Sequence, residues 1–358
     1  MNLQKSKSIS KQNNNLNLIR MCAALLVLLN HSFPLLGLPE PFAANLGITL
    51  GTVAVDVFFV ISGYLVCASL MRKQDSADYF WGRIFRIYPA LIFSTCFSAL
   101  IIGPYLTTLP LDSYFSNPMV LKFVLTGSSI VAGISMNLPG VFEGQPLSAV
   151  NGSLWTLMYE VKMYLLLFLL WIAARKFDEK MSTKFGRRCG SAPVILLLFC
   201  YGAGLILIVK TGLGYEAGYL NRFIFMFFSG ATFFNFRENI VFKKWVFTNL
   251  VILLPLAYLF GALQFQVIYC LSIPYLTLYL AFIPAGVIRQ YNRLGDYSYG
   301  TYIFAFPIQQ TLASINTNIS VAQLALTSLG VTLIFAVLSW HLIEKPILDR
   351  KDFYTLGV

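Results

Sequence analysis

The chain has 358 residues, of which 57% are hydrophobic and only 11% are charged. A soluble domain carries about 25% charged residues, so this composition excludes an ordinary soluble globular protein and predicts that most of the chain lies in lipid. The net charge of +11 is compatible with nucleic-acid binding, but the basic residues concentrate in the connections between apolar segments, which argues against that class.

Short motifs exclude several kinds of enzyme. The sequence contains no G-x-x-x-x-G-K-[ST], H-E-x-x-H or G-x-S-x-G, so P-loop, zinc-hydrolase and serine-hydrolase chemistry have no support. The six cysteines show no C-x-x-C or paired spacing, and most of them lie in apolar stretches. We therefore expect packing thiols, with no disulfide framework and no metal site.

Ten apolar segments are long enough to cross a bilayer as helices. The first is Leu16–Leu36, and the others are 51–71, 88–107, 154–174, 192–210, 219–236, 246–263, 265–283, 299–317 and 322–343. The segment 118–136 is Gly/Ser-rich, and we expect it to be re-entrant or interfacial. The pattern predicts an all-α, polytopic integral membrane protein with about ten transmembrane helices.

The basic residues predict the orientation of these helices. With a cytoplasmic N-terminus, 22 of the 26 Lys and Arg residues fall on the cytoplasmic side. This asymmetry is the one that membrane insertion produces, and it places both termini in the cytoplasm. We expect residues 1–15 to be a disordered cytoplasmic tail, residues 16–346 to be the transmembrane domain, and residues 347–358 to be a cytoplasmic C-terminal tail.

The first span carries two groups that a membrane resists, Arg20 and His31. Eleven residues separate them by about 16 Å along a helix and return them to nearly the same face. Arg20 alone is typical of a topology-setting charge at the membrane surface. His31, one of two histidines in the chain, is either an interfacial polar residue or part of a site.

Two carboxylates accompany His31 in the outer part of the membrane. Asp56 lies about 7 Å into the second span, and Glu160 lies about six residues into the fourth span. Both are expected at a depth similar to that of His31, so three proton-handling groups would share one level. Ser62, next to Gly63 in the middle of the second span, is either a close helix contact or a site residue.

Charged residues elsewhere have two interpretations each. Arg83 and Arg86 are neighbours on one helix face; with the aromatic residues around them they suit phosphate and adenine, or else an interfacial helix. Arg222 is expected to snorkel to the outer surface or to pair with Glu216. Glu344 lies at the cytoplasmic end of the last span, where we expect it to pair with arginines as a structural or donor-side residue.

Six motifs in a fixed order closely resemble acyltransferase family 3 over about residues 16–346. They are Arg20-x10-His31, GTVAVDVFFVISGYL, Arg83-Ile-Phe-Arg86 followed by Tyr-Pro, SLWTLMYE, LGDYSYGTYIFAFP and HLIEKP. The resemblance implies a ten-span enzyme of the bacterial inner (plasma) membrane. Such an enzyme moves an acyl group, usually acetyl from acetyl-CoA, to a hydroxyl of an envelope glycan or its lipid-linked precursor.

The resemblance also implies roles for individual residues. His31 would be the catalytic histidine, Arg20 would complete its motif, and the Arg83/Arg86 pair would contact the CoA donor. Asp56 and Glu160 match acidic positions of the family patterns. The implied partners are acyl-CoA, the glycan acceptor and membrane lipids, without nucleic acid or metal. A hydrolase-like domain that is fused to some relatives is expected to be absent, since the chain ends at Val358.

Three further candidates come from the same motifs: Ser62, Trp155 of the SLWTLMYE motif, and Glu344 of HLIEKP. In the predicted mechanism, His31 acts as general base on the acceptor hydroxyl while Asp56 or Glu160 orients its ring, or His31 carries the acyl group covalently.

The residues leave other functions open. A transporter or flippase with a His/Asp/Glu proton relay is one alternative, and a structural partner in a polysaccharide export complex is another. A membrane acyltransferase that pairs the buried histidine with an asparagine, here Asn30, is a third. The transferred group is acetyl or succinyl, and the acceptor sugar is undetermined.

Overall fold

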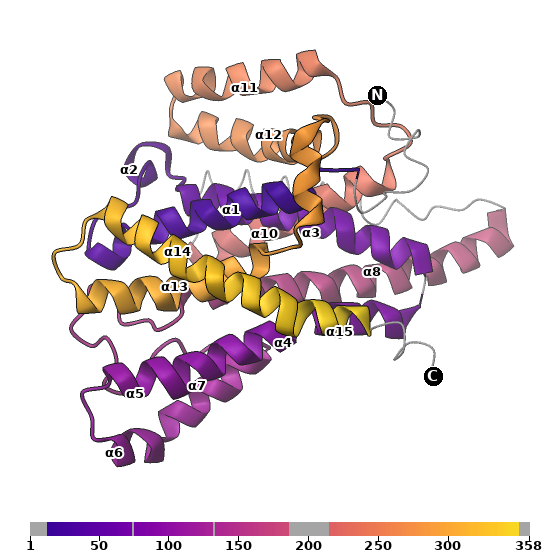
Figure 1. The fold of residues 1–358 in the computed structure, drawn as a ribbon. Coiled ribbons are helices and arrows are strands. Elements are labelled where there is room, and N and C mark those ends of the chain that lie inside the picture. The colour runs from indigo at the N-terminus through magenta and orange to yellow at the C-terminus, as the bar shows by residue number, and fades with distance from the viewer. Residues whose placement is uncertain (1–12, 74, 132, 186–214, 351–358) are drawn as a thin grey trace.

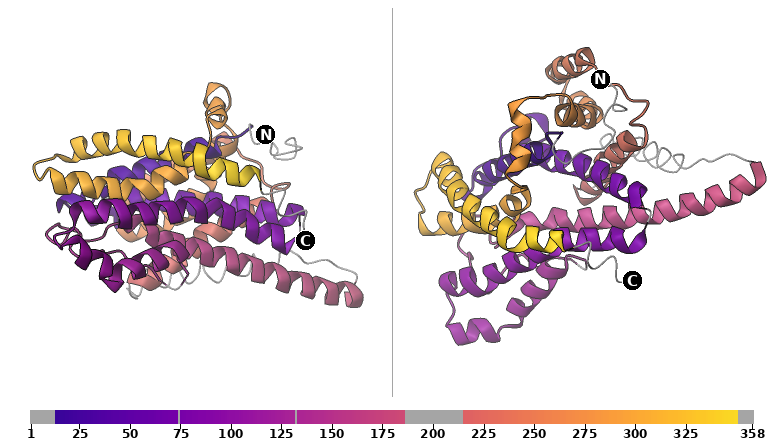
Figure 2. Two further views of the ribbon diagram at one scale, coloured as in Figure 1. Left: turned by 60° about the horizontal axis from the view of Figure 1, so that its bottom comes forward. Right: turned by 45° about the vertical axis from the view of Figure 1, so that its right-hand side comes forward.

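The structure is a computed structural model that describes residues 13–73, 75–131, 133–185 and 215–350. Its secondary structure is helical throughout, with no β-strand in the described ranges. Most of the long helices run side by side in one bundle (Figure 1), and views from two other sides show the same arrangement (Figure 2). The all-α prediction is therefore confirmed.

Two π-helical turns, Ser98–Ile102 and Trp340–Glu344, join α4 to α5 and α14 to α15, so that each pair forms one continuous helix. The α-helices are α1 (Leu16–His31), α2 (Ala43–Leu46), α3 (Leu50–Lys73), α4 (Ser76–Phe97), α5 (Gly103–Leu106), α6 (Leu111–Ser116), α7 (Pro118–Ser129), α8 (Trp155–Phe185), α10 (Tyr215–Asn235), α11 (Lys244–Leu259), α12 (Ala262–Phe282), α13 (Ser298–Ile315), α14 (Val321–Ser339) and α15 (Lys345–Asp349).

Six helical stretches in the described part of the chain are long and apolar enough to cross a membrane. They are Leu16–Leu36, Leu50–Arg72, Ser76–Leu106, Gly152–Lys176, Ala262–Phe282 and Val321–Asp349. Helix α11 is apolar but has only 16 residues, about 24 Å, which is shorter than the hydrocarbon core. The expected span 192–210 lies outside the described residues. The structure therefore supports a multi-pass membrane protein, while ten spans remain a prediction.

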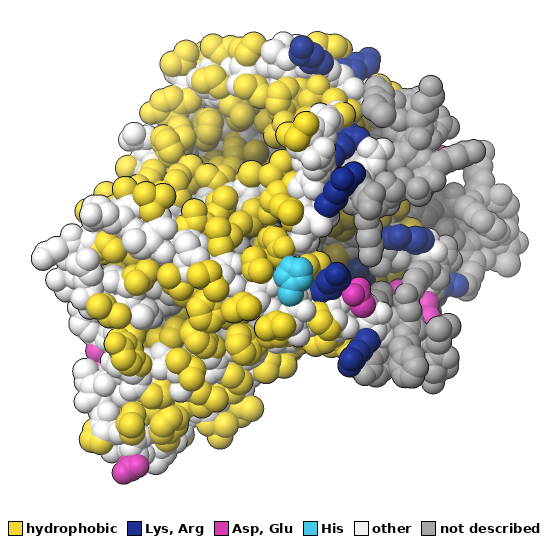
Figure 3. All heavy atoms as spheres, in the orientation of Figure 1, with side chains coloured by type: hydrophobic (Ala, Val, Ile, Leu, Met, Phe, Trp, Pro, Cys, Tyr) yellow, Lys and Arg dark blue, Asp and Glu magenta, His cyan; other side chains and the backbone are white. Residues whose placement is uncertain are grey.

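The first and last described helices meet at one end of the bundle. Leu16 at the start of α1 and Asp349 at the end of α15 line the same cavity, together with six basic side chains. Figure 3 shows Lys and Arg side chains gathered at one end of the visible face, whereas most of the remaining surface is hydrophobic or uncharged. We call this end the basic end and the opposite end, where α1 finishes at His31, the outer end. Their assignment to the cytoplasm and the exterior remains a prediction.

Helix α3 is the most buried of these stretches and packs directly on α10. A Cβ atom added at Gly63 would lie 1.8 Å from the carbonyl oxygen of Phe227, and one at Gly230 would lie 2.0 Å from that of Val60. The two backbones therefore touch, as small residues allow between membrane helices. The close helix contact predicted beside Ser62 is thus made by Gly63.

The segment between α5 and α8 folds back into the bundle. Helix α7 has 12 residues, about 18 Å, and packs along α4, where Gly127 lies against Thr95. The loop that follows penetrates the bundle, because the side-chain amide of Asn151 donates to the buried carbonyl of Ile303 at 2.9 Å. Ile303 lies within α13, so α8 begins inside the helix bundle rather than at its end. The interpretation of 118–136 as re-entrant or interfacial remains a prediction.

Candidate active site

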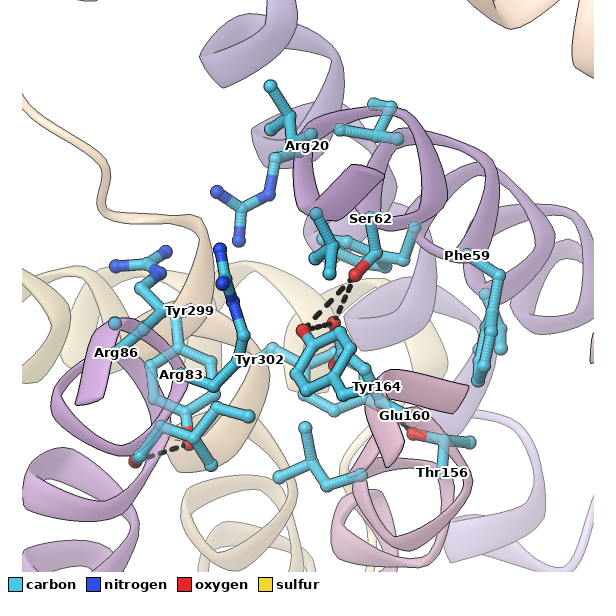
Figure 4. A pocket seen from close by; sticks show the side chains of 18 of the residues that line it. Arg20, Phe59, Ser62, Arg83, Arg86, Thr156, Glu160, Tyr164, Tyr299 and Tyr302 are labelled. Atoms are coloured by element: carbon cyan, nitrogen blue, oxygen red, sulfur yellow. Dashed lines mark hydrogen bonds between the residues drawn. The ribbon is translucent and has the colours of Figure 1, made fainter. Parts of the chain in front are cut away.

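A cavity of about 300 Å³ lies between α1, α3, α4, α8 and α13 (Figure 4). In the close view, three guanidinium groups lie at one side of this cavity, and a hydrogen-bonded group of oxygen atoms lies beside them. Most of the remaining wall is apolar. The predicted site residues that line the cavity are Arg20, Ser62, Arg83, Arg86 and Glu160.

The oxygen group centres on the Glu160 carboxylate. The Ser62 hydroxyl donates to Oε1 of Glu160 at 2.7 Å, and the Tyr164 hydroxyl donates to the same oxygen at 2.5 Å. Glu160 is half-buried, and its Oε2 atom accepts no hydrogen bond from a described residue. The carboxylate is therefore fixed through one oxygen while the other is available to a hydrogen-bond donor in the cavity.

Arg20 and Arg86 belong to an ion network at the basic end. Both guanidiniums contact Oδ2 of Asp296, with Arg86 Nη2 at 2.6 Å. Arg86 Nη1 also lies 3.0 Å from Oε2 of Glu344, which accepts a second bond from Ser339 through its other oxygen. The predicted pairing of Glu344 with an arginine is confirmed. Glu344 itself lies in the π-helical turn before α15 and does not line the cavity.

Asp296 is the anchor of this network and lies in the loop before α13. Burial alone would raise the pKa of its carboxyl group, but the guanidiniums of Arg20 and Arg86 and hydrogen bonds from Ser298 outweigh burial. They lower the pKa of Asp296 from 3.8 to about 2, so the carboxylate is ionised at physiological pH. Two cations and two carboxylates thus nearly neutralise one another.

Arg83 differs from its neighbour Arg86, because it makes no ion pair with a described residue. Its guanidinium donates to the backbone carbonyl of Tyr79 at 3.0 Å and lies 4.8 Å from the centre of the Tyr79 ring. This contact fixes the side chain without neutralising its charge. Arg83 is therefore available to an anion at the cavity wall.

A second, larger cavity of about 920 Å³ opens at the basic end. It shares Arg20, Leu65, Arg86 and Leu348 with the first cavity, so the two are adjacent. We call it the basic vestibule; its lining contains six basic and two acidic side chains. The basic ones are Arg20, Arg72, Arg86, Arg237, Arg289 and Lys345. The sequence predicts the four other than Arg20 and Arg86 only as charges that set the membrane topology, and the fold brings them to one cavity.

His31 lies beyond the other end of the first cavity and does not line it. Its ring packs edge-on against Phe306, with the ring centres 5.0 Å apart. One helical turn earlier in α13, Tyr302 packs edge-on against Phe58 at 5.6 Å, and both of these rings line the cavity. We call Phe58, Tyr302 and Phe306 the aromatic layer. It separates the cavity from His31.

The prediction that His31 and Glu160 share one depth is wrong. Asn30, next to His31, lies against Gly51 near the start of α3, whereas Glu160 binds Ser62 eleven residues further along α3. Glu160 is therefore about 16 Å closer to the basic end. The error arises because α8 begins inside the bundle, so that six residues into α8 is much deeper than six residues from the membrane surface.

Asp56 is fully buried but faces a different partner from the one expected. Its carboxylate pairs with Arg222 Nε at 3.0 Å and accepts a hydrogen bond from the Tyr269 hydroxyl at 2.9 Å. Arg222 therefore turns inward, and the expectation that it snorkels to the surface is wrong. Neither Asp56 nor Glu160 donates to or accepts from His31, whose buried Nδ1 atom has no hydrogen-bond partner among the described residues.

Trp155 lies at the start of α8 in an aromatic cluster. Its ring contacts those of Tyr219 and Phe223, with centres 5.1 and 5.7 Å away, and it does not line the 300 Å³ cavity. The second histidine, His341, is exposed and lies 3.2 Å from the Tyr297 hydroxyl.

The fold adds polar residues near His31 that sequence reasoning missed. Glu40 accepts a hydrogen bond of 2.5 Å from the Asn30 amide, and Gln309 and Gln310 are fully buried in α13. The adjacent glutamines in an apolar segment were the available signal, because polar side chains inside membrane helices are costly and are usually functional.

Comparison with known proteins identifies the family. The sequence model described as "Acyltransferase domain" matches residues 13–342. An O-acetyl transferase of Shigella phage Sf6 is 28% identical over 345 residues, which cover 93% of this chain and 95% of the phage protein. Nodulation protein 10 of Rhizobium leguminosarum bv. viciae is 31% identical over 166 residues, or 45% of each chain. No solved structure shows a significant match.

The family match covers nearly the whole chain, and the ordered motifs lie within it. The arginine and carboxylate groups of these motifs meet around two adjacent cavities within a bundle of apolar helices. The chain therefore belongs to acyltransferase family 3 and is a multi-pass membrane O-acetyltransferase.

Proposed function

We propose that the protein transfers an acetyl group from cytoplasmic acetyl-CoA to a hydroxyl of a cell-envelope glycan or its lipid-linked precursor. One observation carries this proposal. A basic vestibule at one end of the bundle adjoins a smaller cavity, and half-buried His31 lies near the other end, against the Phe306 ring. This arrangement suits a donor with a highly anionic head and a long neutral arm.

The vestibule would hold the phosphates of CoA. Arginine binds phosphate through paired, charge-assisted hydrogen bonds, and six basic side chains against two acidic ones leave an excess of positive charge there. Arg83 adds a cation that no described carboxylate neutralises. Arg20 and Arg86 are held by Asp296 and Glu344, so we assign them mainly to shaping the entrance.

The 300 Å³ cavity would hold the pantetheine arm. Its wall is largely apolar, with the Ser62–Glu160–Tyr164 oxygen group as its main polar feature apart from the arginines. The arm carries two amide groups, and the free Oε2 of Glu160 suits an amide N–H. We therefore propose that Glu160 binds the donor, because its position about 16 Å from the level of His31 does not suit orientation of the imidazole.

His31 would perform the transfer. As general base, it takes the proton of the acceptor hydroxyl while that oxygen attacks the thioester carbonyl; the C–S bond breaks, and the imidazolium protonates the CoA thiolate. As nucleophile, it attacks the thioester first, releases CoA, and passes the acetyl group to the acceptor oxygen. Both routes require the thioester to pass the aromatic layer, so rotation of its rings is part of the proposal.

The acceptor would approach from the outer end. An envelope glycan and a bacterial inner membrane fit this direction, since acetyl-CoA is cytoplasmic and the acceptor is assembled or displayed outside. The similarity to an O-acetyl transferase supports acetyl over succinyl as the transferred group.

No observation favours the transporter alternative. That idea rested on three titratable groups at one depth, but Asp56 is paired with Arg222 and Glu160 lies deeper than His31. We propose that Asp56 and Trp155 hold α3, α8, α10 and α12 together around the site rather than taking part in the chemistry.

The test uses purified protein in lipid nanodiscs with acetyl-CoA and a panel of glycosides as hydroxyl acceptors, and it measures release of the CoA thiol. His31→Ala is compared with His341→Ala, which removes the exposed second histidine. Loss of the general base or nucleophile should lower kcat by about 10³-fold while KM for acetyl-CoA stays within about twofold. His341→Ala should behave as wild type. Full turnover by His31→Ala would contradict both chemical routes.

A further inference from the structure

Three buried amide side chains lie at the outer end, on the two helices that carry His31 and its ring partner Phe306. Asn30 precedes His31 on α1, and Gln309 and Gln310 lie on α13; each side chain is at most 2% exposed. Gln309 donates to the carbonyl of Leu28 and to the hydroxyl of Ser32, both at 2.8 Å, so its amide contacts α1 on either side of His31 in sequence.

The position of Phe306 on α13 brings Gln310 to the outer end as well. Residues three and four apart on a helix are neighbours, so Gln309 and Gln310 follow Phe306 on one side of α13. The Phe306 ring contacts His31, and Gly152 packs against the same ring from the α8 side. The two glutamines therefore lie within one helical turn of the ring that contacts His31.

The orientation of each amide follows from its partner. The nitrogen of Gln310 donates to the carbonyl of Leu147, and that of Asn30 donates to the Glu40 carboxylate. The nitrogen of Gln309 donates to the Leu28 carbonyl. Carbonyl and ionised carboxylate oxygens accept hydrogen bonds and do not donate them, so the amide nitrogen must face them. The amide oxygens consequently point elsewhere.

Those oxygens have no partners within the described chain. Oε1 of Gln309, Oε1 of Gln310 and Oδ1 of Asn30 are buried without a hydrogen bond, as are His31 Nδ1 and the hydroxyl of Ser153 next to Gly152. Buried polar groups in native proteins are nearly always satisfied, so a concentration of unsatisfied ones indicates a missing polar partner. Three of these five atoms are neutral acceptors that require donors.

We propose that these amides are the acceptor subsite and that they bind hydroxyl groups of an uncharged sugar beside His31. Sugar hydroxyls supply the donors that three amide oxygens need. An anionic ligand such as a uronate carboxylate or a phosphate would place acceptor against acceptor and is disfavoured. This assignment rests on the proposed function, and it makes Gln309, Gln310 and Asn30 binding residues for the acceptor.

Binding of the acceptor is measured apart from catalysis, by saturation-transfer NMR on the full-length protein in nanodiscs. The probes are a panel of uncharged methyl glycosides and methyl glucuronide as the anionic counterpart. Wild type should saturate at least one uncharged glycoside but not the glucuronide. His31→Ala should retain this binding while it loses CoA release.

Gln310→Met and Gln309→Met keep the side-chain size and remove the hydrogen-bonding groups. Each should weaken binding of the uncharged glycoside by about tenfold, because its hydroxyls lose an acceptor. The matched control is Gln266→Met in α12. The Gln266 amide donates to the Leu46 carbonyl over 3.0 Å and belongs to none of the contacts of these three amides. Gln310→Met should keep KM for acetyl-CoA and the unfolding temperature within the range of this control, which shows that the variant is folded.

Three results would overturn the subsite. Wild type shows no saturation transfer to any uncharged glycoside, or both glutamine variants bind the glycoside as well as Gln266→Met does, or the protein binds the glucuronide in preference. In the first case the unsatisfied amides hold only water. Failure of the proposed function is a separate result: it would appear as absent CoA release from wild type whether or not a sugar binds.

Discussion

The two ends of the bundle bury polar groups in different ways. At the basic end, Arg20 and Arg86 are paired with Asp296 and Glu344, and further cations line the vestibule. At the outer end, three neutral amides near His31 have unsatisfied oxygens, and Glu40, bonded to Asn30, is the one carboxylate named there. The basic end is thus built mainly from charges and the outer end mainly from uncharged hydrogen-bonding groups.

The difference teaches how one membrane protein can recognise two unlike substrates. Under the proposed function, charge attracts and selects the anionic donor from the aqueous side, where the open vestibule limits desolvation. An uncharged acceptor gains little from charge, so neutral acceptor atoms select it by the number and position of its hydroxyls. Breaking either end should therefore affect one substrate and spare the other.

The largest effect is expected from Arg86→Gln at the basic end. It leaves Glu344, which is 1% exposed, and part of the Asp296 charge without compensation, and it should destabilise the protein by about 3 kcal/mol or more. Thermal unfolding of the detergent-solubilised protein measures this loss. Glu344→Gln in the same chain should restore much of the stability. An unchanged unfolding temperature in Arg86→Gln would show that the network is not structural.

The Asp56–Arg222 pair tests whether the charges between the two ends are structural. Asp56→Asn leaves a buried guanidinium unpaired and should cost about 3 kcal/mol, while the Asp56→Asn/Arg222→Gln double variant should lose less than the sum of the two single changes. The folded fraction should keep its KM for acetyl-CoA. Lost turnover at an unchanged unfolding temperature would instead make Asp56 catalytic.

Acid should weaken the basic end selectively. Because the pKa of Asp296 is lowered to about 2, its ionised form stabilises the folded protein above about pH 4, and this contribution is lost as the pH falls toward 2. The shift corresponds to about 2 kcal/mol. The difference in unfolding free energy between wild type and Asp296→Asn should therefore shrink over this range. If this difference in unfolding free energy stays constant with pH, the ionised Asp296 carboxylate is not the source of the stabilisation.

The smallest effect is expected from Arg83→Gln, which removes the uncompensated cation. KM for acetyl-CoA should rise about tenfold without loss of stability, because a single charge-assisted hydrogen bond is lost. Added salt should also weaken binding of acetyl-CoA, because screening shortens the range of the vestibule charges. It should leave binding of the uncharged sugar unchanged. Arg175→Gln, on the half of α8 beyond the cavity, is the control. Equal salt dependence of donor and sugar would remove the contrast between the ends.

Sequence reasoning located the basic end well because charge is visible in a sequence. The spacing of Arg83 and Arg86, the cytoplasmic placement of Glu344 and the first-span motif predicted a cluster that the fold assembles. The vestibule was missed because Arg72, Arg237 and Arg289 come from separate connections, and only the tertiary structure brings them to one cavity.

Depth and partners were harder to predict. The residues before α8 look like an exposed loop, and nothing in their composition shows that Asn151 reaches the Ile303 carbonyl and starts α8 inside the bundle. The pairing of Asp56 with Arg222 joins distant parts of the sequence, so local spacing carried no information about it. The glutamines of α13 were visible, but a neutral amide does not by itself indicate a chemistry.

The aromatic layer has a consequence for the energy metabolism of the membrane. An enzyme whose substrates arrive from opposite sides is exposed to proton and ion leakage through any continuous column of water. The cavity from the basic end is bounded by Phe58 and Tyr302, and the Phe306 ring covers His31 beyond them. Hydrophobic rings raise the energy of an ion at a constriction, so under the proposed function this layer would insulate the membrane electrically between turnovers.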